Sequence, residues 1–376
     1  MPRTNFPSQG PIRYAVVGLG HIAQVAVLPA FKNAGKNSQL VAIVSGDQKK
    51  LREMREEHNV PVAVTYDALP ALYESGQIDA VYIALPNSLH ARATIDAARA
   101  GLHVLCEKPM AVREEECEDM IRACREHGVR LMIAYRLHFE AATLRAVELV
   151  RSGKIGEPRV FTSLFTMNVK DKKNIRLRGE EGNGPLWDIG IYCINAARSV
   201  FRAEPVEVLG FGAAKPNDAR FREVDETFSA ILRYPGERVG SFTCSFGCND
   251  SSRYTVVGTE GSVTLDPAFE YAEGLGLELT IGDKKPKKRE YAKRDQFAAE
   301  IMYFSHCLLT GEHPEPSGVE GLNDVAIMRA LLRSAREGRA VRVDLPRDRH
   351  PHAGQRIDRP GHSGGREVGV VSPRGE

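Results

Sequence analysis

The chain has 376 residues, more than a single hydrophobic core usually organises, so we expect two domains. Its hydrophobic fraction of 42% and charged fraction of 27% are typical of globular proteins, and its formal net charge of +2 provides no long-range attraction to nucleic acid or membrane. These numbers exclude a lone small module and predict neither a nucleic-acid nor a membrane partner.

The seven cysteines form no dense framework, and their odd number predicts reduced thiols rather than a disulfide scaffold. Cys244 and Cys248 have no further ligands at zinc spacing, so we expect no metal site and interpret both as small core residues. The amino terminus lacks the apolar run of a signal peptide, and no stretch reaches the roughly 18 apolar residues of a membrane helix. The sequence therefore predicts a cytoplasmic protein.

Residues 12 to about 134 alternate short apolar runs with longer amphipathic stretches, the pattern of β-α-β units. The apolar runs are continuous, as in AVYIAL, which is typical of parallel strands covered on both faces by helices. We expect a doubly wound, Rossmann-type nucleotide-binding domain over residues 1–135, with strands at 12–17, 40–44, 62–64, 80–84, 103–106 and 130–134.

After Tyr135 the pattern changes to an α+β one. A helix at 141–151 precedes runs such as RVFTSLF, FSAILRY, VGSFTCSF and YTVVGT, which predict antiparallel strands separated by turns with Gly236 and Gly261. Helices at about 295–309 and 319–336 close this second domain, over residues 136–345. The tail, residues 346–376, has few large apolar side chains and is predicted to be disordered.

The first strand runs into the dinucleotide fingerprint G-x-G-x-x-A, residues Gly18-Leu19-Gly20-His21-Ile22-Ala23. Gly18 allows a tight turn, Gly20 lets a pyrophosphate approach the backbone, and Ala23 lets the following helix pack on the sheet. The alternative is a tight turn without a ligand. Because the motif follows a strand and opens a helix, we predict a dinucleotide site that includes His21 and Ile22.

The end of the second strand indicates which dinucleotide binds. NAD enzymes usually carry an acidic residue here that binds the ribose 2′-hydroxyl, whereas this chain has Ser45 and Gly46, followed by Lys49 and Lys50. A hydroxyl, backbone N–H groups and an ammonium suit a 2′-phosphate, so the sequence favours NADP over NAD. In the alternatives, the lysines form a solvated helix face, and Asp47 is either a helix cap or reverses the preference.

Two further strand ends carry polar residues. Ligands of open α/β sheets bind outside the carboxyl ends of the strands, so these residues are predicted to line the ribose and nicotinamide site. In the alternative, Asn87 and His90 are helix caps or polar groups satisfied within the protein. Lys108 stands between an apolar strand and a proline, so its side chain is expected to be partly buried. A partly buried amine either forms an ion pair or loses its proton, and we therefore predict a functional role for Lys108. The predicted lining residues are Leu85, Pro86, Asn87, His90, Glu107 and Lys108.

In the second domain, Asp188 and Tyr192 are four residues apart, which on a helix places both side chains on one face. They are candidates to address one substrate; the alternative is a capping aspartate with a tyrosine packed in the core. Arg176 and Arg178 lie in a polar loop and either reach the substrate or the cofactor, or are simply solvated. Tyr135 and Arg136 follow the sixth strand and are predicted at the nicotinamide pocket.

Taken in order, these segments resemble the glucose-fructose oxidoreductase/inositol dehydrogenase/rhizopine catabolism (Gfo/Idh/MocA) superfamily over residues 12–345. The resemblance is carried by AVVGLGHIA, DAVYIALPNSLHA, GLHVLCEKPMA, IAYRLHFE, GPLWDIGIY and EGLNDVAIMRALLRSAREGRAV. The branch it resembles most is that of glucose-fructose oxidoreductase, which shares SGxxxK, YRxHFE, RLR and DIGIY.

The resemblance implies a second domain built on an open mixed, mainly antiparallel sheet, which binds the substrate and forms homodimers or homotetramers. It also implies NADP bound through Ser45 and Lys50, and a catalytic group of Lys108, Asp188 and Tyr192. Many relatives have histidine where this chain has Tyr192, so the acid-base group here is expected to be a phenol, as in the glucose-fructose oxidoreductase branch.

Oxidation of a carbinol requires removal of the hydroxyl proton as hydride leaves, and an isolated tyrosine, with a pKa of about 10, is a weak base at neutral pH. A nearby ammonium favours the phenolate. We therefore expect Tyr192 to exchange the proton, Lys108 to supply the positive charge and to bind the substrate oxygen, and Asp188 to position a neighbouring sugar hydroxyl. In the alternative, Lys108 carries the proton.

The leading hypothesis is an NADP-dependent oxidoreductase of a sugar or polyol. A dihydrodiol, xylose or inositol dehydrogenase of the same superfamily is a second hypothesis. A third, from another class, is a catalytically silent sugar sensor or regulator that binds NADP; the presence of Lys108, Asp188 and Tyr192 argues against it, and no basic DNA-reading motif is visible.

Overall fold

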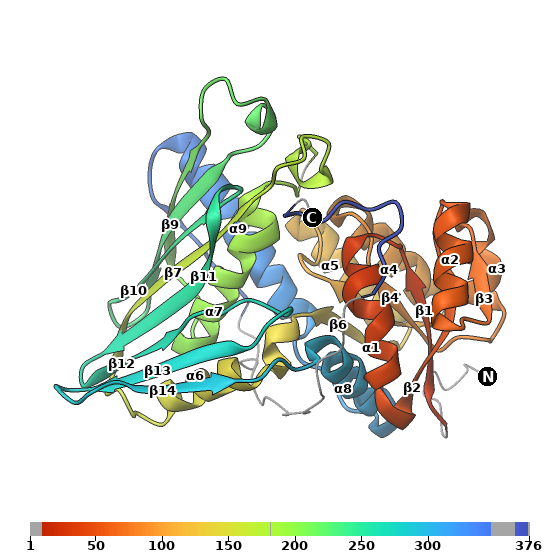
Figure 1. The fold of residues 1–376 in the computed structure, drawn as a ribbon, viewed down its shortest axis with the longest axis horizontal. Coiled ribbons are helices and arrows are strands. Elements are labelled where there is room, and N and C mark those ends of the chain that lie inside the picture. The colour runs from red at the N-terminus through yellow and green to blue at the C-terminus, as the bar shows by residue number, and fades with distance from the viewer. Residues whose placement is uncertain (1–9, 181, 347–364, 375–376) are drawn as a thin grey trace. The chain divides into compact units, whose positions relative to one another are not determined.

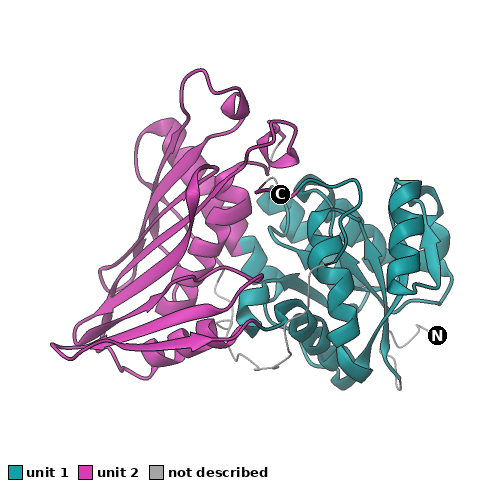
Figure 2. Ribbon diagram, viewed as in Figure 1, with its two compact units in different colours: residues 1–139, 294–322, 355–371 teal, residues 140–293, 323–354, 372–376 magenta. Residues whose placement is uncertain are grey.

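The computed structural model describes residues 10–180, 182–346 and 365–374. The chain divides into two compact units, drawn in teal and magenta in Figure 2. Unit 1 comprises residues 1–139, 294–322 and 355–371, and unit 2 comprises residues 140–293, 323–354 and 372–376.

Unit 1 contains a parallel sheet of six strands in the order β3-β2-β1-β4-β5-β6. This order places the β1 and β4 ends beside each other, where the chain reverses its direction of winding across the sheet. The predicted Rossmann fold is confirmed, and each predicted strand is present with small shifts at its ends. The strands are β1 (Ile12–Val17), β2 (Ser38–Val44), β3 (Val62–Val64), β4 (Ala80–Ile83), β5 (His103–Glu107) and β6 (Leu131–Ala134).

Helices flank this sheet, as Figure 1 shows for α1, α2, α4 and α5. In α4 the small side chains of Ala91, Ala97 and Ala98 are buried, which allows the helix to pack closely on the sheet. The helices are α1 (Leu28–Asn33), α2 (Gln48–His58), α3 (Leu69–Glu74), α4 (His90–Arg99), α5 (Glu114–Glu126) and α8 (Gln296–Thr310), with shorter turns η1 (Ala23–Val27), η2 (Gly35–Asn37), η3 (Tyr66–Ala68), η4 (Asn87–Leu89) and η5 (Arg136–Phe139).

Helix α8 differs from the sequence prediction, which assigned residues 295–309 to the second domain. In the structure α8 belongs to unit 1, where it packs against β1, β2 and α1. The Tyr14 hydroxyl lies 2.7 Å from the Ser305 hydroxyl, and Ser38 contacts the same group at 2.8 Å. A parallel sheet buries both faces, and α8 returns late in the chain to cover part of one of them.

Unit 2 is built on a nine-stranded sheet in the order β14-β13-β12-β11-β7-β10-β9-β8-β15. Strands β7 and β10 pair in parallel and the other neighbours pair antiparallel, so the predicted open mixed sheet is confirmed. The strands are β7 (Pro158–Asn168), β8 (Glu207–Ala213), β9 (Thr227–Tyr234), β10 (Arg238–Ser245), β11 (Gly247–Gly258), β12 (Gly261–Leu265), β13 (Leu275–Ile281), β14 (Lys287–Tyr291) and β15 (Val341–Arg342).

The two faces of this sheet have different environments. Side chains such as Phe161, Phe228 and Tyr254 are buried on the face that packs against helices. The helices of unit 2 are α6 (Ala141–Arg151), α7 (Ile191–Phe201) and α9 (Gly318–Glu337) from residue 323 onward, with turns η6 (Ile175–Leu177), η7 (Leu186–Gly190) and η8 (Ala219–Phe221). The outer face exposes apolar side chains, namely Val160, Leu209, Phe211, Ile231, Val239 and Val257.

The predicted turns contain Gly236 and Gly261, and each glycine is required for its own structural reason. Gly236 has a φ of +76°, as predicted for the β9–β10 turn. Gly261 is required for a different reason, because a Cβ there would lie 2.2 Å from the carbonyl oxygen of Thr280 on the neighbouring strand. All seven cysteines are free thiols, but Cys248 is exposed rather than in the core, because it lies in the exposed first residues of β11.

The predicted disordered tail, residues 346–376, is described in the structure only at residues 346 and 365–374, and the rest lies outside the described residues. For residues 365–374 the structure differs from the prediction: Val368 is buried and Arg374 pairs with Asp250 and Glu270. One apolar side chain and two carboxylates anchor a segment whose composition predicted none of these contacts. Across the described ranges, no helix combines the length and apolarity that crossing a membrane requires.

Candidate active site

The loop after β1 is shaped by the close approach of two backbones. Gly18 has a φ of +100°, and a Cβ there would lie 2.4 Å from the carbonyl oxygen of Ala84. The Gly18 N–H donates to the carbonyl oxygen of Val44 at 3.0 Å, so the ends of β1, β2 and β4 converge at this residue. Only glycine fits this position.

The next fingerprint positions suit a dinucleotide phosphate. A Cβ at Gly20 would meet only the Ala84 carbonyl oxygen, at 4.0 Å, so the backbone here is open on that side. Ala23 is fully buried at the start of η1, and Ile22 precedes it half-buried. His21 is half-buried, with its Nδ1 3.5 Å from a carboxylate oxygen of Glu367. The residues present thus fit the approach of a pyrophosphate to a bare backbone.

The end of β2 presents a buried hydroxyl beside an exposed glycine. The Oγ of Ser45 accepts a hydrogen bond from the N–H of Asp47 at 3.2 Å. A Cβ at Gly46 would meet only the ring of Tyr66, at 3.5 Å. This strand end therefore offers hydrogen-bonding groups with space beside them.

Asp47 caps α2, which was one of the alternatives for this residue. Its Oδ1 accepts from the N–H of Lys49 at 2.8 Å and of Lys50 at 3.2 Å. The Lys49 side chain is exposed and lies 3.9 Å from Glu53, whereas Lys50 is half-buried. Because the Asp47 carboxylate is engaged by the helix, Lys50 is the side chain of this segment best suited to bind an anion.

His90, predicted to contact a cofactor, is fully buried at the start of α4. Its Nδ1 lies 2.8 Å from the carbonyl oxygen of Pro109, and its Nε2 lies 2.9 Å from that of Leu85. Burial lowers the pKa of this imidazole. His90 therefore ties the end of β4 to the segment that follows Lys108, and it acts through the backbone. Of its neighbours after β4, Pro86 is exposed and Asn87 is half-buried at the start of η4.

Lys108 is half-buried directly after β5, and its neighbour Glu107 lies in a buried acidic cluster. The Tyr82 hydroxyl donates to Glu107 Oε1 at 2.8 Å and lies 3.4 Å from Glu300 Oε1. Burial raises the pKa of Glu107, and the charge of Lys108 opposes that rise. Burial, followed by the charge of Glu107, raises the pKa of Glu300 well above its ordinary value.

Glu300 is a residue that the sequence analysis missed. It lies on α8, far along the chain from β4 and β5, and is completely buried. A signal was present in the sequence, since Glu300 is a single charge within the apolar run FAAEIMYF. Because neighbouring carboxylates resist ionising together, burial and the charge of Glu107 favour the protonated form of Glu300.

The two candidates after β6 are both buried in unit 1. The ring of Tyr135 stacks on that of His138 at 5.7 Å between centroids. Arg136 donates from Nη1 to Gln296 Oε1 at 2.6 Å, and its guanidinium lies 6.0 Å from the centroid of the Phe297 ring. Arg136 also opposes the rise in the pKa of Glu107, so its charge acts on the segment that carries Lys108.

In unit 2 the structure brings Asp188 and Arg176 together. The Nε of Arg176 donates to Asp188 Oδ2 at 2.7 Å, with both side chains partly exposed. The loop is fixed by its backbone, because the N–H of Gly184 donates to the Arg176 carbonyl and the N–H of Asp188 donates to the Gly184 carbonyl. Arg178 is exposed on the same loop and does not share this pair.

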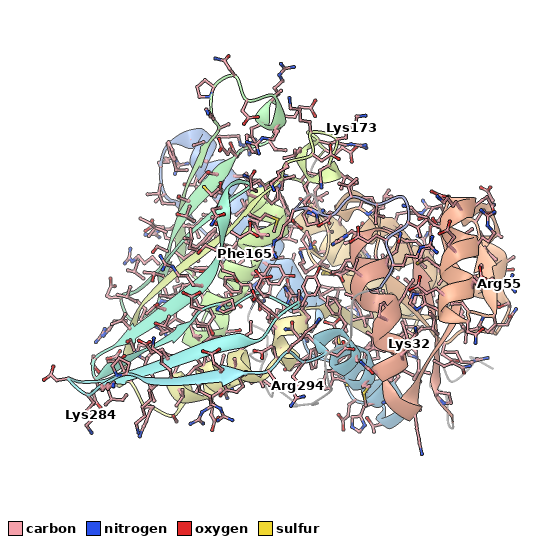
Figure 3. The ribbon with its side chains drawn as sticks, in the orientation of Figure 1. Lys32, Arg55, Phe165, Lys173, Lys284 and Arg294 are labelled. Carbon is pink, nitrogen blue, oxygen red and sulfur yellow. The ribbon has the colours of Figure 1, made fainter. Side chains whose placement is uncertain are left out.

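Asp188 lies in the π-helical turn η7, and Tyr192 follows in α7. Four residues bring a side chain back close to its starting direction in either helix type, so both belong to one face. Tyr192 is half-buried, its ring 5.7 Å from that of Phe165 on β7, labelled in Figure 3, and 6.0 Å from that of Phe269. These two aromatic rings pack against the Tyr192 ring, and the side chain remains partly accessible.

A parallel sheet in this strand order, with a glycine loop that a phosphate can approach after β1, is typical of a dinucleotide-binding Rossmann domain. The family model described as "Oxidoreductase family, NAD-binding Rossmann fold" matches residues 12–135, and the model of the family's C-terminal domain matches residues 143–264. The chain belongs to the Gfo/Idh/MocA family of oxidoreductases.

Several relatives are similar over nearly their whole length. An NADP-dependent D-xylose 1-dehydrogenase from Haloarcula marismortui is 34% identical, with 90% of this chain and 94% of that protein covered. The crystal structure of aldose-aldose oxidoreductase from Caulobacter crescentus with glycerol matches with a TM-score of 0.84 and 38% identity, over 89% of this chain and all of that one. A 3-ketoreductase from Actinomadura kijaniata, solved with NADP and TDP-benzene, matches at 28% identity and a TM-score of 0.77, over 86% and 98%.

Replacing Glu300 by glutamine is expected to stabilise the protein increasingly as the pH rises. The raised pKa of Glu300 in the folded state means that ionisation above the ordinary carboxyl pKa favours unfolding, and glutamine removes that cost. Relative to the unmodified chain, the Tm of E300Q should rise between pH 5 and pH 8 by roughly 2–4 °C, the shift that about 1 kcal/mol produces in a domain of this size.

The measurement is thermal unfolding followed by circular dichroism across that pH range. Glu74→Gln, a change at an exposed position on α3, is the matched control and should give a pH-independent difference. A constant Tm difference between E300Q and the unmodified chain would contradict the assignment of a raised pKa.

Proposed function

We propose that this chain is an NADP-dependent oxidoreductase that interconverts a carbinol and a carbonyl carbon of a sugar or polyol. The observation that carries the proposal is the arrangement in unit 2, where Asp188 is paired with Arg176 and precedes a partly accessible phenol by one helical turn. The family assignment and the sugar-oxidising relatives support the same reaction class.

The cofactor proposed is NADP rather than NAD. Gly18, Gly20 and Ala23 would accept the pyrophosphate, while the Ser45 hydroxyl and the Lys50 ammonium would bind the 2′-phosphate. The engagement of Asp47 as a helix cap supports this choice, since its carboxylate then serves α2. When bound, the nicotinamide ring supplies a hydride acceptor or donor at its C4 atom.

In the proposed chemistry, the phenol oxygen of Tyr192 takes the substrate hydroxyl proton during oxidation and returns it during reduction. The Lys108 ammonium binds the same substrate oxygen and favours the phenolate by its charge. Asp188, held by Arg176, accepts a hydrogen bond from a neighbouring sugar hydroxyl and so orients the substrate.

The buried residues around Lys108 have a supporting part in this proposal. His90 ties the residue after Lys108 to the end of the neighbouring strand β4, through its contacts with the carbonyl oxygens of Pro109 and Leu85. The buried charged groups Glu107 and Arg136 contribute to the electrostatic environment of the Lys108 ammonium. These residues position Lys108 and exclude water from its stem, rather than touching the substrate.

Tyr192→Phe should reduce turnover by about 10²–10⁴-fold, the usual range for a lost acid-base group, while NADP binding is retained. The phenylalanine ring keeps the packing against Phe165 and Phe269, so only the hydroxyl is lost. Turnover is followed by absorbance of reduced nicotinamide with a panel of aldoses, ketoses and polyols.

The matched control is Tyr254→Phe, which removes a buried phenolic hydroxyl from the same aromatic cluster. Full activity of Y192F would refute the role of the phenol. If the unmodified chain binds NADP tightly and is silent with every sugar, it is a sensor rather than an enzyme.

Lys50→Ala should weaken NADP binding by about 10–100-fold and leave NAD binding nearly unchanged, because a charge-assisted bond to the 2′-phosphate contributes on that scale. Dissociation constants for both cofactors are measured by fluorescence titration. Lys49→Ala is the control, since Lys49 is exposed and lies near Glu53. An equal loss for both cofactors in K50A would contradict recognition of the 2′-phosphate.

We also propose that the outer face of the unit 2 sheet is a self-association surface that forms homodimers or homotetramers. Phe211 is 70% exposed there, among apolar neighbours on β7 to β11. A contiguous apolar sheet face of this kind is typical of a protein–protein interface.

Phe211→Asp should lower the molar mass measured by light scattering to that of a smaller species, because it places a charge within the apolar face. Leu309→Asp, at an exposed apolar position on α8, is the control and should leave the mass unchanged. A mass that is the same in F211D and in the unmodified chain would exclude this face.

A further inference from the structure

The described end of the chain contacts the dinucleotide fingerprint directly. Residues 365–371, here called the C-terminal strap, are held by the side-chain amide of Gln24. Its Oε1 accepts from the N–H of Val368 at 2.7 Å, and its Nε2 donates to the carbonyl oxygen of Val368 at 3.1 Å and to that of Leu19 at 2.8 Å. One buried amide therefore joins the strap to the fingerprint loop.

Further polar contacts extend along the strap. The Nη2 of Arg366 lies 3.0 Å from Glu53 Oε2, and its backbone N–H donates to Glu57 Oε1 at 3.3 Å. Glu367 lies 3.5 Å from the ring nitrogen of His21, inside the fingerprint. The strap thus bridges the loop after β1 and helix α2, the two segments proposed to hold the adenosine half of the cofactor.

The strap also approaches the residue proposed to bind the 2′-phosphate. A Cβ at Gly369 would lie 3.2 Å from the Cε of Lys50 and 3.7 Å from a carboxylate oxygen of Asp47. The backbone of Gly369 therefore packs against the stem of Lys50 and limits the rotamers of that long side chain. Figure 1 shows the strap, in dark blue, beside α1.

The strap borders the cofactor site without filling it. No strap atom lies within 4 Å of the Cβ position of Gly20 or of Gly46, so the strap does not pack on that side of either glycine. A segment that competed with the cofactor would cover these two glycines. The contacts of the strap with the fingerprint loop and with Lys50 instead favour a strap that lies beside the bound dinucleotide.

We propose that the C-terminal strap is part of the cofactor site: it forms a wall beside the adenosine 2′-phosphate end of NADP, pre-orders Lys50, and slows cofactor release. This inference rests on the proposed function, because it takes NADP as the ligand. It adds Gln24, Val368 and Gly369 as residues that determine how long the cofactor remains bound.

The experiment measures release of NADPH from the intact protein, by stopped-flow fluorescence with excess NADP as the trap. Two variants remove the strap in different ways: deletion of residues 365–376, and Val368→Asp, which places a charge at a buried position. Val371→Asp makes the same change at an exposed position of the strap and is the matched control.

We expect release about tenfold faster in the deletion and in V368D, because Lys50 then loses the contact with Gly369 that limits its rotamers, and unchanged release in V371D. A second readout uses the unmodified chain: hydrogen exchange across residues 365–371 should slow when NADP is added. Unchanged release in both variants, slower release, or exchange insensitive to NADP would overturn the proposal.

Two different failures are distinguishable in this design. If the unmodified chain binds no NADPH in the initial titration, the proposed function fails and the strap proposal fails with it. If NADPH binds and its release is indifferent to the strap, only the strap proposal is overturned.

Discussion

The candidate cofactor site depends on one contact between backbones, that of Gly18 with the carbonyl of Ala84. The absence of a side chain at Gly18 lets the loop after β1 lie against the end of β4, while its N–H holds the end of β2. Any larger residue would separate these strand ends, and the fingerprint loop, Ser45 and His90 would lose their common edge of the sheet. The positions of the other candidate residues of unit 1 follow from this convergence.

Around that edge, much of the polarity is buried rather than presented to a ligand. His90, Glu107 and Arg136 each engage protein groups, and Tyr82 joins Glu107 to Glu300. Such a network holds the segment carrying Lys108 in one conformation, since each buried polar atom that lost its partner would carry a desolvation cost. The ammonium is thereby placed on a rigid support.

Local patterns predicted most of the fold, and long-range contacts explain where prediction failed. Continuous apolar runs identified the strands of the first sheet, and helical spacing identified α6 closely. Strand β14, with the sequence KKREY, was not predicted because an edge strand carries charges that hide its periodicity. The position of α8 in unit 1 and the anchoring of Val368 depend on residues hundreds of positions away, which no local window contains.

The same distinction applies to the candidate site. The fingerprint, Lys108, and the pair of Asp188 and Tyr192 could be recognised from spacing. The pairing of Arg176 with Asp188 was not predicted, since Arg176 was expected either to reach a ligand or to be solvated, and Glu300 and Gln24 were not considered. The roles of these three residues depend on their contact partners in the folded protein, and a sequence pattern does not show those partners.

The distribution of thiols has a chemical consequence of its own. Burial raises the pKa of Cys106, Cys193 and Cys244, and Cys117, Cys124 and Cys307 are similarly shielded. Cys248 alone among the seven is exposed. A maleimide dye or a spin label would therefore attach at a single position on β11, which gives the sheet of unit 2 a built-in handle for spectroscopy without any engineered cysteine.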